Sequence, residues 1–286
     1  MIDVSSHPGG IIIFKGLFMT RITRGLKLAA FVVSALALAP TAFAQAFDVV
    51  RLYGASRPGD GGMVGAVAIA GRKYQGSDER RILLVPLLDY QWKNGWFAGT
   101  TNGVGYNFSR QPDMDYGVRL TADLGRSESR SAALRGLGNV DARPEIGAFY
   151  NYALSPSLAL TSSLRYGSGN DKNGMVLDVG AAYSMLLAPQ WRLGLGVSAT
   201  VANANYMQTY FGVTPAQSAR SGYAPYTAGA GLRDVRASAA LTYSLTPRVA
   251  ITTALSASSL QGDAKDSSIT RKRSTATGLV SAFYAF

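Results

Sequence analysis

The sequence predicts an all-β protein, an antiparallel transmembrane β-barrel of the outer-membrane type with about twelve strands. The first observation is an alternation of apolar and polar residues with a period of two, over segments of about 9 to 11 residues, the strand length that crosses a bilayer. The second is the face opposite the apolar one, which carries Gly, Ala, Ser and Thr with few charged residues, as a confined lumen does. The third is the last stretch, residues 278–286, a strand that ends on Phe286.

The alternative fold is a soluble β-sandwich, whose outer face meets bulk water and carries abundant Lys and Glu. Only 16% of the 286 residues are charged, and 32 are glycine. This sparse charge favours the barrel. The last strand fits the same prediction, because Tyr284 and Phe286 share its apolar face and are expected to form part of the signal that the barrel assembly machinery reads.

An export signal is expected before the barrel. Basic residues from Arg21 to Lys27 precede an apolar run at 28–39, and Ala42-Phe43-Ala44 is a small-residue cleavage site. The apolar run is too short for a transmembrane helix, which needs about 20 apolar residues. We therefore expect a mis-assigned upstream extension at 1–18, a signal peptide at 19–44 that is cleaved after Ala44, and a single barrel domain at 45–286.

Removal of residues 1–44 takes away four cations, one anion and the sole histidine, His7, which changes the formal net charge from +11 to +8. The exported chain then contains neither His nor Cys, so it lacks the commonest general base, thiols and disulfides. Carboxylates such as Asp263 and Asp266 remain, and we expect them to be solvated loop acids rather than calcium ligands. The composition predicts no enzyme, no cofactor and no metal site, and export argues against a nucleic-acid partner.

The amino-terminal part of the barrel is the least regular. Candidate strands lie at 48–55, which is a weak candidate, and at 63–74, 81–92 and 96–108. The Asn-Gly turn at 93–95 separates the last two of these strands. Pro86 can donate no ladder hydrogen bond, so we expect a bulge or a locally weak pairing beside it.

From Tyr116 onward the alternation is regular. The expected strands are 116–124, 145–154, 158–166, 175–185, 191–201, 235–245, 249–260 and 278–286. The total is twelve with residues 48–55 and odd without them. Because bacterial single-chain barrels have even strand numbers, ten strands are the alternative.

Counting back from a periplasmic Phe286 places the short turns at Ser155, Ala188 and Thr246 on the periplasmic side. The longer loops at 126–139, 167–174, 203–228 and 261–273 then all lie outside. Aromatic residues near strand ends on the apolar face predict two girdles at the membrane interfaces. These residues are Tyr90, Trp92, Tyr152, Tyr166, Tyr183, Trp191, Tyr243 and Tyr284.

Several sequence blocks carry a family resemblance. They are LLVPLLDYQW at 83–92, LRGLGNVDARPEIGAFYNY at 134–152, YFGV at 210–213, QSARSG at 217–222 and AGAGLRDV at 228–235. In these blocks the chain resembles the MipA/OmpV family, named after the MltA-interacting protein and outer-membrane protein V. The resemblance covers nearly all of the exported part. It implies an outer-membrane barrel, whose founding member is described as a scaffold that joins a murein lytic transglycosylase to a murein synthase.

The resemblance therefore implies a non-enzymatic scaffold or interaction protein of the cell envelope, with these two murein enzymes as partners. Other members are described as adhesins or envelope-stress proteins, so a surface adhesin is one alternative. A narrow diffusion channel is another, because the predicted lumen face is rich in Gly, Ser and Thr. Location in the outer membrane adds the lipid bilayer, lipopolysaccharide and the barrel assembly machinery as partners.

Three sets of residues are candidates for function. The loop at 203–228 is the best candidate recognition surface, because aromatic and Arg side chains on a positioned loop are typical anchors, and the alternative is that it folds inward as a plug. Its candidate residues are Tyr206, Tyr210, Phe211, Gly212, Gln217, Ser218, Arg220 and Gly222.

The second set is the charged residues of the predicted lumen face, which either tune a pore or pair across the lumen and plug it. They are Arg119, Asp123, Glu145, Arg165, Asp178, Arg192 and Arg236. Basic loop residues that are candidates for contact with outer-leaflet phosphates are Arg126, Arg130, Arg135, Arg220, Arg271, Lys272 and Arg273.

Overall fold

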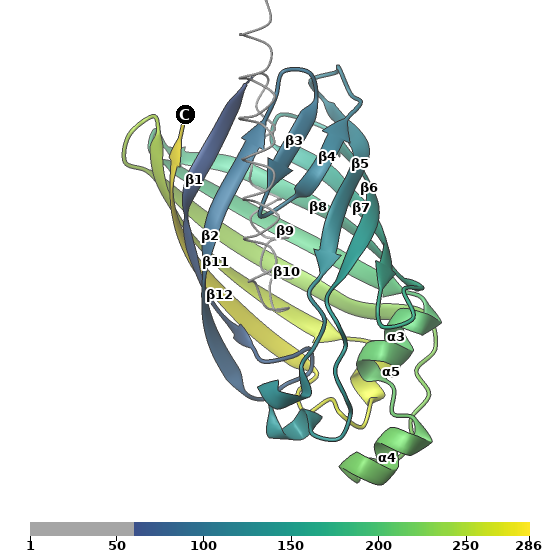
Figure 1. The fold of residues 1–286 in the computed structure, drawn as a ribbon. Helices are drawn as coiled ribbons and strands as arrows, with labels where there is room; N and C mark the ends of the chain where they lie inside the picture. Colours follow the sequence, from purple (N-terminus) through teal and green to yellow (C-terminus); the bar gives the residue numbers. More distant parts are fainter. Residues whose placement is uncertain (1–59) are drawn as a thin grey trace, which may run out of the picture.

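The computed structural model describes residues 60–286, which form one closed antiparallel barrel of twelve strands (Figure 1). Each strand pairs with its neighbours in sequence, and β12 closes the barrel on β1. The all-β barrel and the strand number are therefore confirmed. The upstream extension, the signal peptide and the weak strand at 48–55 lie outside the described residues.

The strands are long except for two. They are β1 Gly61–Arg72, β2 Arg80–Gln91, β3 Trp96–Gly99, β4 Gly103–Asn107, β5 Met114–Asp123, β6 Arg143–Ala153, β7 Leu158–Ser168, β8 Gly174–Ala188, β9 Trp191–Ala202, β10 Gly231–Ser244, β11 Val249–Leu260 and β12 Ser274–Ala285. The helical segments are η1 Glu128–Arg130, η2 Ala132–Leu134, α3 Ala204–Phe211, α4 Pro215–Ser221 and α5 Gly262–Asp266. None of the helices within residues 60–286 is long and apolar enough to cross a bilayer.

Side chains alternate between the outside and the inside of the barrel. On β5, Val118 and Leu120 are 46% and 52% exposed, whereas Arg119 between them is 8% exposed. The same alternation runs through the closing strand, where Val280 is exposed and Ser281 is buried. The apolar side chains that the period of two assigns to the lipid therefore point away from the lumen.

The strand expected at 96–108 is wrong, because the chain reverses within it. Residues 96–99 form β3 and residues 103–107 form β4, and a turn at 100–102 joins them. Gly103 closes the turn at a positive φ of 74°, and a Cβ atom there would lie 2.1 Å from the carbonyl oxygen of Leu120. Only glycine fits this position. This split supplies the twelfth strand of the described barrel.

The short β3–β4 hairpin leaves part of β2 without a neighbour. β2 pairs with β1 along its whole length, but with β3 only at residues 89–91. The preceding residue of β2, Leu88, still accepts a backbone hydrogen bond through its carbonyl, from the N–H of Thr100 at 2.7 Å. Because backbone groups of alternate residues point to the same side, those of Pro86 and Leu84 face this free edge of β2.

Pro86 therefore lies where its missing N–H costs no ladder hydrogen bond. The prediction of locally weak pairing is confirmed, because the β2–β3 ladder ends before Pro86. The alternative prediction of a bulge is wrong, because the β1–β2 register is continuous through the Ala66–Pro86 pair.

The two ends of the barrel are built differently. The end that carries the carboxyl terminus holds the short turns, since Ala285 donates to the carbonyl of Arg248 and Ser244 to that of Gln190. We call it the turn end. The opposite end, the loop end, holds the segments 73–79, 124–142, 169–173, 203–230 and 261–273. This grouping of turns and loops is the one that the strand count predicts.

An aromatic girdle surrounds the turn end alone. The rings of Trp96, Tyr106, Phe108 and Tyr116 follow one another with centroids 5.3, 5.2 and 6.2 Å apart. Of the aromatic residues predicted for two girdles, Tyr166 is at the loop end and the others are at the turn end. The second girdle is wrong, because the strands there end in aliphatic or small residues such as Ile82, Ile146 and Met175.

The lumen is polar on one wall and apolar on the other. The apolar wall is formed by β1, β2 and β10–β12, whose inward side chains make one buried cluster. Its members are Val67, Ile69, Val85, Leu87, Ala240, Ala254 and Leu279. The lumen face that is expected to be rich in Gly, Ala, Ser and Thr is found on the strands from β5 onward. The inward side chains of β1 and β2 are large and aliphatic instead.

Candidate functional site

Helix α3 folds inward over the loop end of the barrel (Figure 1). Asn203 begins the helix, and its side-chain oxygen accepts hydrogen bonds from the N–H groups of Tyr206 and Met175, each at 3.0 Å. The first bond caps the helix and the second attaches it to the start of β8. Gly212 ends the helix and donates its N–H to the carbonyl of Gln208.

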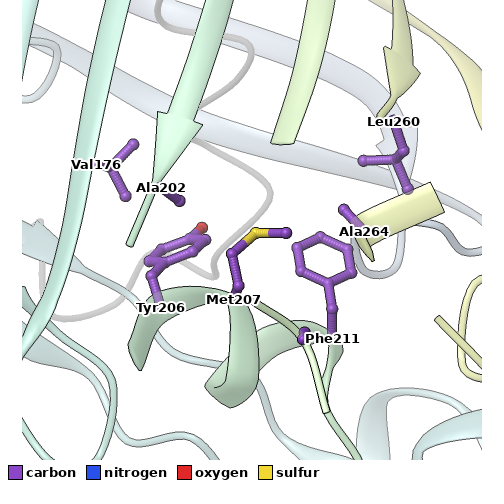
Figure 2. Close-up of a cluster of buried hydrophobic side chains, with 8 residues drawn as sticks. Val176, Ala202, Tyr206, Met207, Phe211, Leu260 and Ala264 are labelled. Carbon is purple, nitrogen blue, oxygen red and sulfur yellow. The ribbon is translucent and has the colours of Figure 1, made fainter. Parts of the chain in front are cut away.

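The inward face of α3 is apolar. Figure 2 shows Tyr206, Met207 and Phe211 pointing from the helix toward the barrel wall. They pack against Val176, Ala202, Leu260, Ala264 and Ala228, and Phe211 and Ala264 are fully buried. A helix of this length is not stable alone in water, so this burial is what holds it in place. Of the two interpretations of the loop, the structure shows the inward one for residues 204–211.

Polar contacts attach the same helix to β5. The hydroxyl of Tyr210 donates to the carboxylate of Asp123, with oxygen–oxygen distances of 2.6 and 2.5 Å. Nη1 of Arg126 donates to the Tyr210 carbonyl at 2.8 Å, and its guanidinium lies 6.0 Å from the Tyr210 ring centroid. Burial and the neighbouring Asp123 charge raise the pKa of Tyr210 well above its usual value, so the phenol stays protonated and donates.

A second tyrosine of α3 reaches the opposite wall. The hydroxyl of Tyr206 accepts a hydrogen bond from Nη1 of Arg233 at 3.0 Å, and the guanidinium lies 5.4 Å from the ring centroid. Burial raises the pKa of Tyr206, so it is neutral at physiological pH. Tyr206 and Tyr210 therefore tie one helix to β10 and β5, on different sides of the lumen.

Arg233 and Asp234 are site residues that the sequence reasoning missed. The β9–β10 register shifts between Leu232 and Asp234, and this bulge turns both charged side chains inward. Nε of Arg233 donates to Asp234 at 2.6 Å, and Nη2 of Arg236 donates to the same carboxylate at 3.1 Å. The signal was present in the sequence, because Leu232 and Val235 are three residues apart and cannot share a face without a bulge.

Arg165 on β7 joins the carboxylates of Glu145 on β6 and Asp178 on β8, on the polar wall of the lumen, which we call the charged wall. Its Nη2 atom lies 2.8 Å from the carboxylate of Asp178, and its Nη1 atom lies 3.7 Å from that of Glu145. Asp178 also accepts from the Thr200 hydroxyl at 2.8 Å. The Glu145 side chain is only 2% exposed, so its charge depends on this partner.

The structure brings most of the predicted lumen charges together. Arg119, Asp123, Glu145, Arg165 and Asp178 line the charged wall formed by β5–β8, and Arg236 lies on β10 beside Asp234. Arg119 donates to the Ser163 hydroxyl at 2.6 Å and lies over the Phe149 ring. Arg192 lies apart from this group, exposed at the turn end beside Ser184. These charges pair along the wall, with side chains of the same strand or of strands one or two places away, and not across the lumen.

Helix α4 projects beyond the rest of the loop end (Figure 1) and buries none of its side chains. Thr214 and Gln217 form a capping box at its start, and Gly222 ends it with a φ of 78°. Gln217 also donates to the carbonyl of Leu137 at 2.6 Å, and Arg220 to that of Gly136 at 3.2 Å. The carbonyl of Ser218 accepts from Gly222.

The loops at the loop end form one connected cap. Tyr226 donates to the carbonyl of Asp263 at 3.0 Å, and Tyr223 to that of Ala133 at 3.1 Å. A second apolar cluster joins the same segments through Tyr74, Leu134, Leu137, Val213 and Ile269. Because each loop contacts at least one other, the cap is a folded layer and not a set of separate loops.

The predicted basic loop residues divide between the inside and the outside of this cap. Arg126 is buried on Tyr210, so its predicted contact with lipid phosphates is wrong. Arg271 donates to the Tyr223 hydroxyl at 2.9 Å, and Arg273 pairs with Asp266 at 3.3 Å. Arg135 and Lys272 are exposed. Asp263, the other loop acid, accepts from the N–H of Gly229 at 2.6 Å.

The closing strand holds both residues of the predicted assembly signal on the lipid-facing side. Tyr284 and Phe286 are exposed, and their ring planes stack with centroids 6.4 Å apart. Phe286 exchanges two backbone hydrogen bonds of 3.0 Å with Gly62, which closes the barrel at the turn end. Its ring also lies 6.2 Å from that of Tyr90.

Comparison with known proteins gives one family match. The model of the family described as MltA-interacting protein MipA matches residues 64–286. A search of curated protein sequences finds no match.

Solved structures give low similarity. The NanC porin has 9% identity and a TM-score of 0.44, over 77% of this chain and 98% of that one. An outer-membrane channel from Pseudomonas putida F1 has 14% identity and a TM-score of 0.43, over 81% and 97%. A bacterial polysaccharide outer membrane secretin has 7% identity and a TM-score of 0.45, over 79% and 97%. Similarity at this level says nothing about what the chain binds or transports.

Proposed function

Because the chain belongs to the family of the MltA-interacting protein MipA, we propose that it is a non-enzymatic barrel of the outer membrane that acts as an interaction protein, or scaffold, of the cell envelope. The observation that carries this proposal is the attachment of helix α3 at the loop end of the lumen. Helix α3 covers the loop end and is tied to two walls, by Tyr210 to Asp123 and by Tyr206 to Arg233. A barrel closed in this way offers its surfaces, and not a passage, to its partners.

The proposed location rests on the lipid-facing surface. Exposed Val, Leu and Ile side chains cover the long strands, and the girdle of aromatic rings surrounds the turn end. A surface of this kind is stable in a bilayer and not in water. The proposal places the turn end in the periplasm and the loop end outside, and it includes a signal peptide at 19–44 with cleavage after Ala44.

The proposed partners are murein enzymes at the turn end. The family name specifies MltA, a murein lytic transglycosylase, and the scaffold role adds a murein synthase. Both act in the periplasm, so they can reach only the turn end and the segment that precedes Asp60. Exposed basic side chains on three turn-end loops, Lys93, Arg110 and Arg248, provide a surface on which a partner can dock.

The experiment that tests this function is a pull-down from detergent-solubilised envelope. Wild type is compared with the triple charge reversal Lys93→Glu, Arg110→Glu and Arg248→Glu. The matched control reverses three exposed loop-end residues, Arg135→Glu, Lys172→Glu and Lys272→Glu. We expect murein enzymes to be recovered with wild type and the control, and at least several-fold less with the turn-end variant. Recovery at background with wild type would reject the scaffold role.

Surface binding through α4 is the second candidate function. The helix projects outward and buries no side chain, which leaves Ala219 and Arg220 exposed. Replacement of residues 215–221 by a Gly-Ser linker removes this surface but keeps α3. Reduced cell adhesion with an unchanged pull-down would support an adhesin, and unchanged adhesion would exclude α4 from that role.

A further inference from the structure

Two arginines lie side by side on the lipid-facing surface near the loop end. Arg72 on β1 is directly opposite Arg80 on β2, and both have the lipid-facing parity of their neighbours Ala70 and Ile82. Like charges directly opposite one another in a sheet are destabilising, so an anion bound between the two guanidinium groups would stabilise the pair.

The described residues supply no ion pair to either arginine. Nη1 of Arg72 donates to the backbone carbonyl of Asp78 at 2.7 Å, and its buried Nε atom has no hydrogen-bond partner. The loop that joins β1 to β2 holds two acids: Glu79 is held by Lys73 and by the Ser131 hydroxyl, and the Asp78 side chain is exposed. Because the Arg72 Nε atom is buried, an anion from outside the chain would be bound by the exposed guanidinium of Arg80 and by the terminal nitrogens of Arg72.

A strip of small apolar residues, which we call the trough, begins one lipid-facing position from the arginine pair, in the direction of the turn end. Ala70 is opposite Ile82 on one side and Gly278 on the other, and Gly278 is in turn opposite Leu255. The two small residues form a floor two strands wide, about 10 Å. Ile82 and Leu255 flank it with 78% and 67% of their surface exposed, and the Cδ2 methyl of Leu255 leans toward Gly278, 3.5 Å from where a Cβ atom of that residue would lie. The next row narrows the trough, since Val280 fills the position beside Ala68.

From this arrangement we propose that the barrel binds a phosphate-bearing lipid of the outer leaflet. The phosphate lies between the guanidinium groups of Arg72 and Arg80, and an acyl chain lies on Ala70 and Gly278 between Ile82 and Leu255. Arginine is suited to this role, because its planar fork donates two parallel hydrogen bonds to phosphate. The inference rests on the proposed function for its orientation, which places the loop end in the outer leaflet.

The experiment measures retention of one defined lipid by the purified full chain. The protein in mixed micelles is incubated with diphosphorylated lipid A or with the same lipid lacking both phosphates, and bound lipid is counted by native mass spectrometry. The variant is Arg72→Gln with Arg80→Gln. The control is Arg135→Gln with Arg192→Gln, two exposed arginines that lie away from the Arg72–Arg80 pair. Ala70→Leu, which fills the trough and keeps both charges, is the third variant.

We expect at least tenfold lower retention of lipid A by the Arg72→Gln, Arg80→Gln protein and wild-type retention by the control. Ala70→Leu is expected to lower the retention of both lipids. With the lipid that lacks phosphates, wild type and the double variant are expected to show the same retention. Equal retention by wild type and the double variant, or dimers in place of lipid adducts, would overturn the inference. The envelope pull-down with the double variant separates the two proposals, because the lipid site can fail while murein enzymes are still recovered.

Discussion

The hydroxyl of Tyr210 lies 2.6 and 2.5 Å from the two carboxylate oxygens of Asp123, a contact between residues 87 positions apart in the sequence. Asp123 is at the loop end of β5 and Tyr210 is in the last turn of α3. The same carboxylate accepts the N–H groups of Gly125 at 3.1 Å and Gly169 at 3.2 Å. One acidic side chain thus joins the helix, β5 and the β7–β8 loop.

The first prediction concerns this contact. Tyr210→Phe removes the hydroxyl and leaves Asp123 with fewer donors, so we expect the free energy of unfolding to fall by about 1 to 3 kcal/mol. The measurement is equilibrium unfolding in detergent, with limited proteolysis of residues 203–228 as the local readout. Tyr166→Phe is the control, because its hydroxyl bonds to Asn173 in an exposed position. An equal effect of both substitutions would contradict the prediction.

The second prediction concerns the charged wall. Arg165→Gln leaves the carboxylates of Glu145 and Asp178 without the cation that joins them, so we expect a loss of about 3 to 5 kcal/mol in the free energy of unfolding. Arg192→Gln removes an exposed arginine of the same lumen face and is expected to cost less than about 1 kcal/mol. The two variants are compared by urea unfolding. Similar losses for both would show that the wall does not depend on Arg165.

The third prediction uses the free edge of β2. Pro86→Ala is expected to change the free energy of unfolding by less than about 1 kcal/mol, because the backbone of residue 86 faces no strand. Val85→Pro is expected to cost about 3 kcal/mol or more, because the backbone of residue 85 pairs with β1. The measurement is heat-modifiable gel mobility, which shows whether each variant is a folded barrel. A gain of more than about 1 kcal/mol for Pro86→Ala would mean that β2 has a partner at this edge, because the new N–H would then complete a ladder hydrogen bond.

The fourth prediction concerns pH. Burial, with a smaller contribution from the charge of Tyr223, raises the pKa of Tyr74 from 10.0 to about 12. The folded protein therefore holds this proton more tightly than the unfolded chain does. The resulting stability is fully present below pH 10 and is lost as the pH rises to about 12.

Tyr74 donates to the carbonyl of Ile269 at 3.2 Å, so its ionisation should loosen the contact between the β1–β2 loop and the loop before β12. We expect protease sensitivity of residues 261–273 to increase above pH 10 in wild type. Tyr74→Phe should make that sensitivity less dependent on pH. An identical pH profile for both proteins would count against the assignment.

Much of the barrel is predictable from the sequence, because a strand with one face in lipid must alternate. Val118, Arg119 and Leu120 show the pattern that makes β5 recognisable without any structure. The hairpin within residues 96–108 was not predicted, because its turn residues 100–102 interrupt an apolar run only briefly. Its reversal depends on the positive φ of Gly103, which the pattern of apolar residues does not reveal.

The candidate site was predicted in its residue types and not in its connections. The lumen charges Glu145, Arg165 and Asp178 follow from their inward parity. The position of α3 does not follow from any local pattern, because it depends on contacts of Tyr206 and Tyr210 with residues far away in the sequence. Local propensity carries no information about such long-range contacts.

The account depends most on the closed lumen, and single-channel recording in planar bilayers tests it directly. We expect purified wild-type protein to insert without conductance steps. The triple variant Tyr206→Ala, Tyr210→Ala and Phe211→Ala should release α3 and produce steps. Stable conductance from wild type, equal to that of the triple variant, would contradict the closed barrel and favour a diffusion channel.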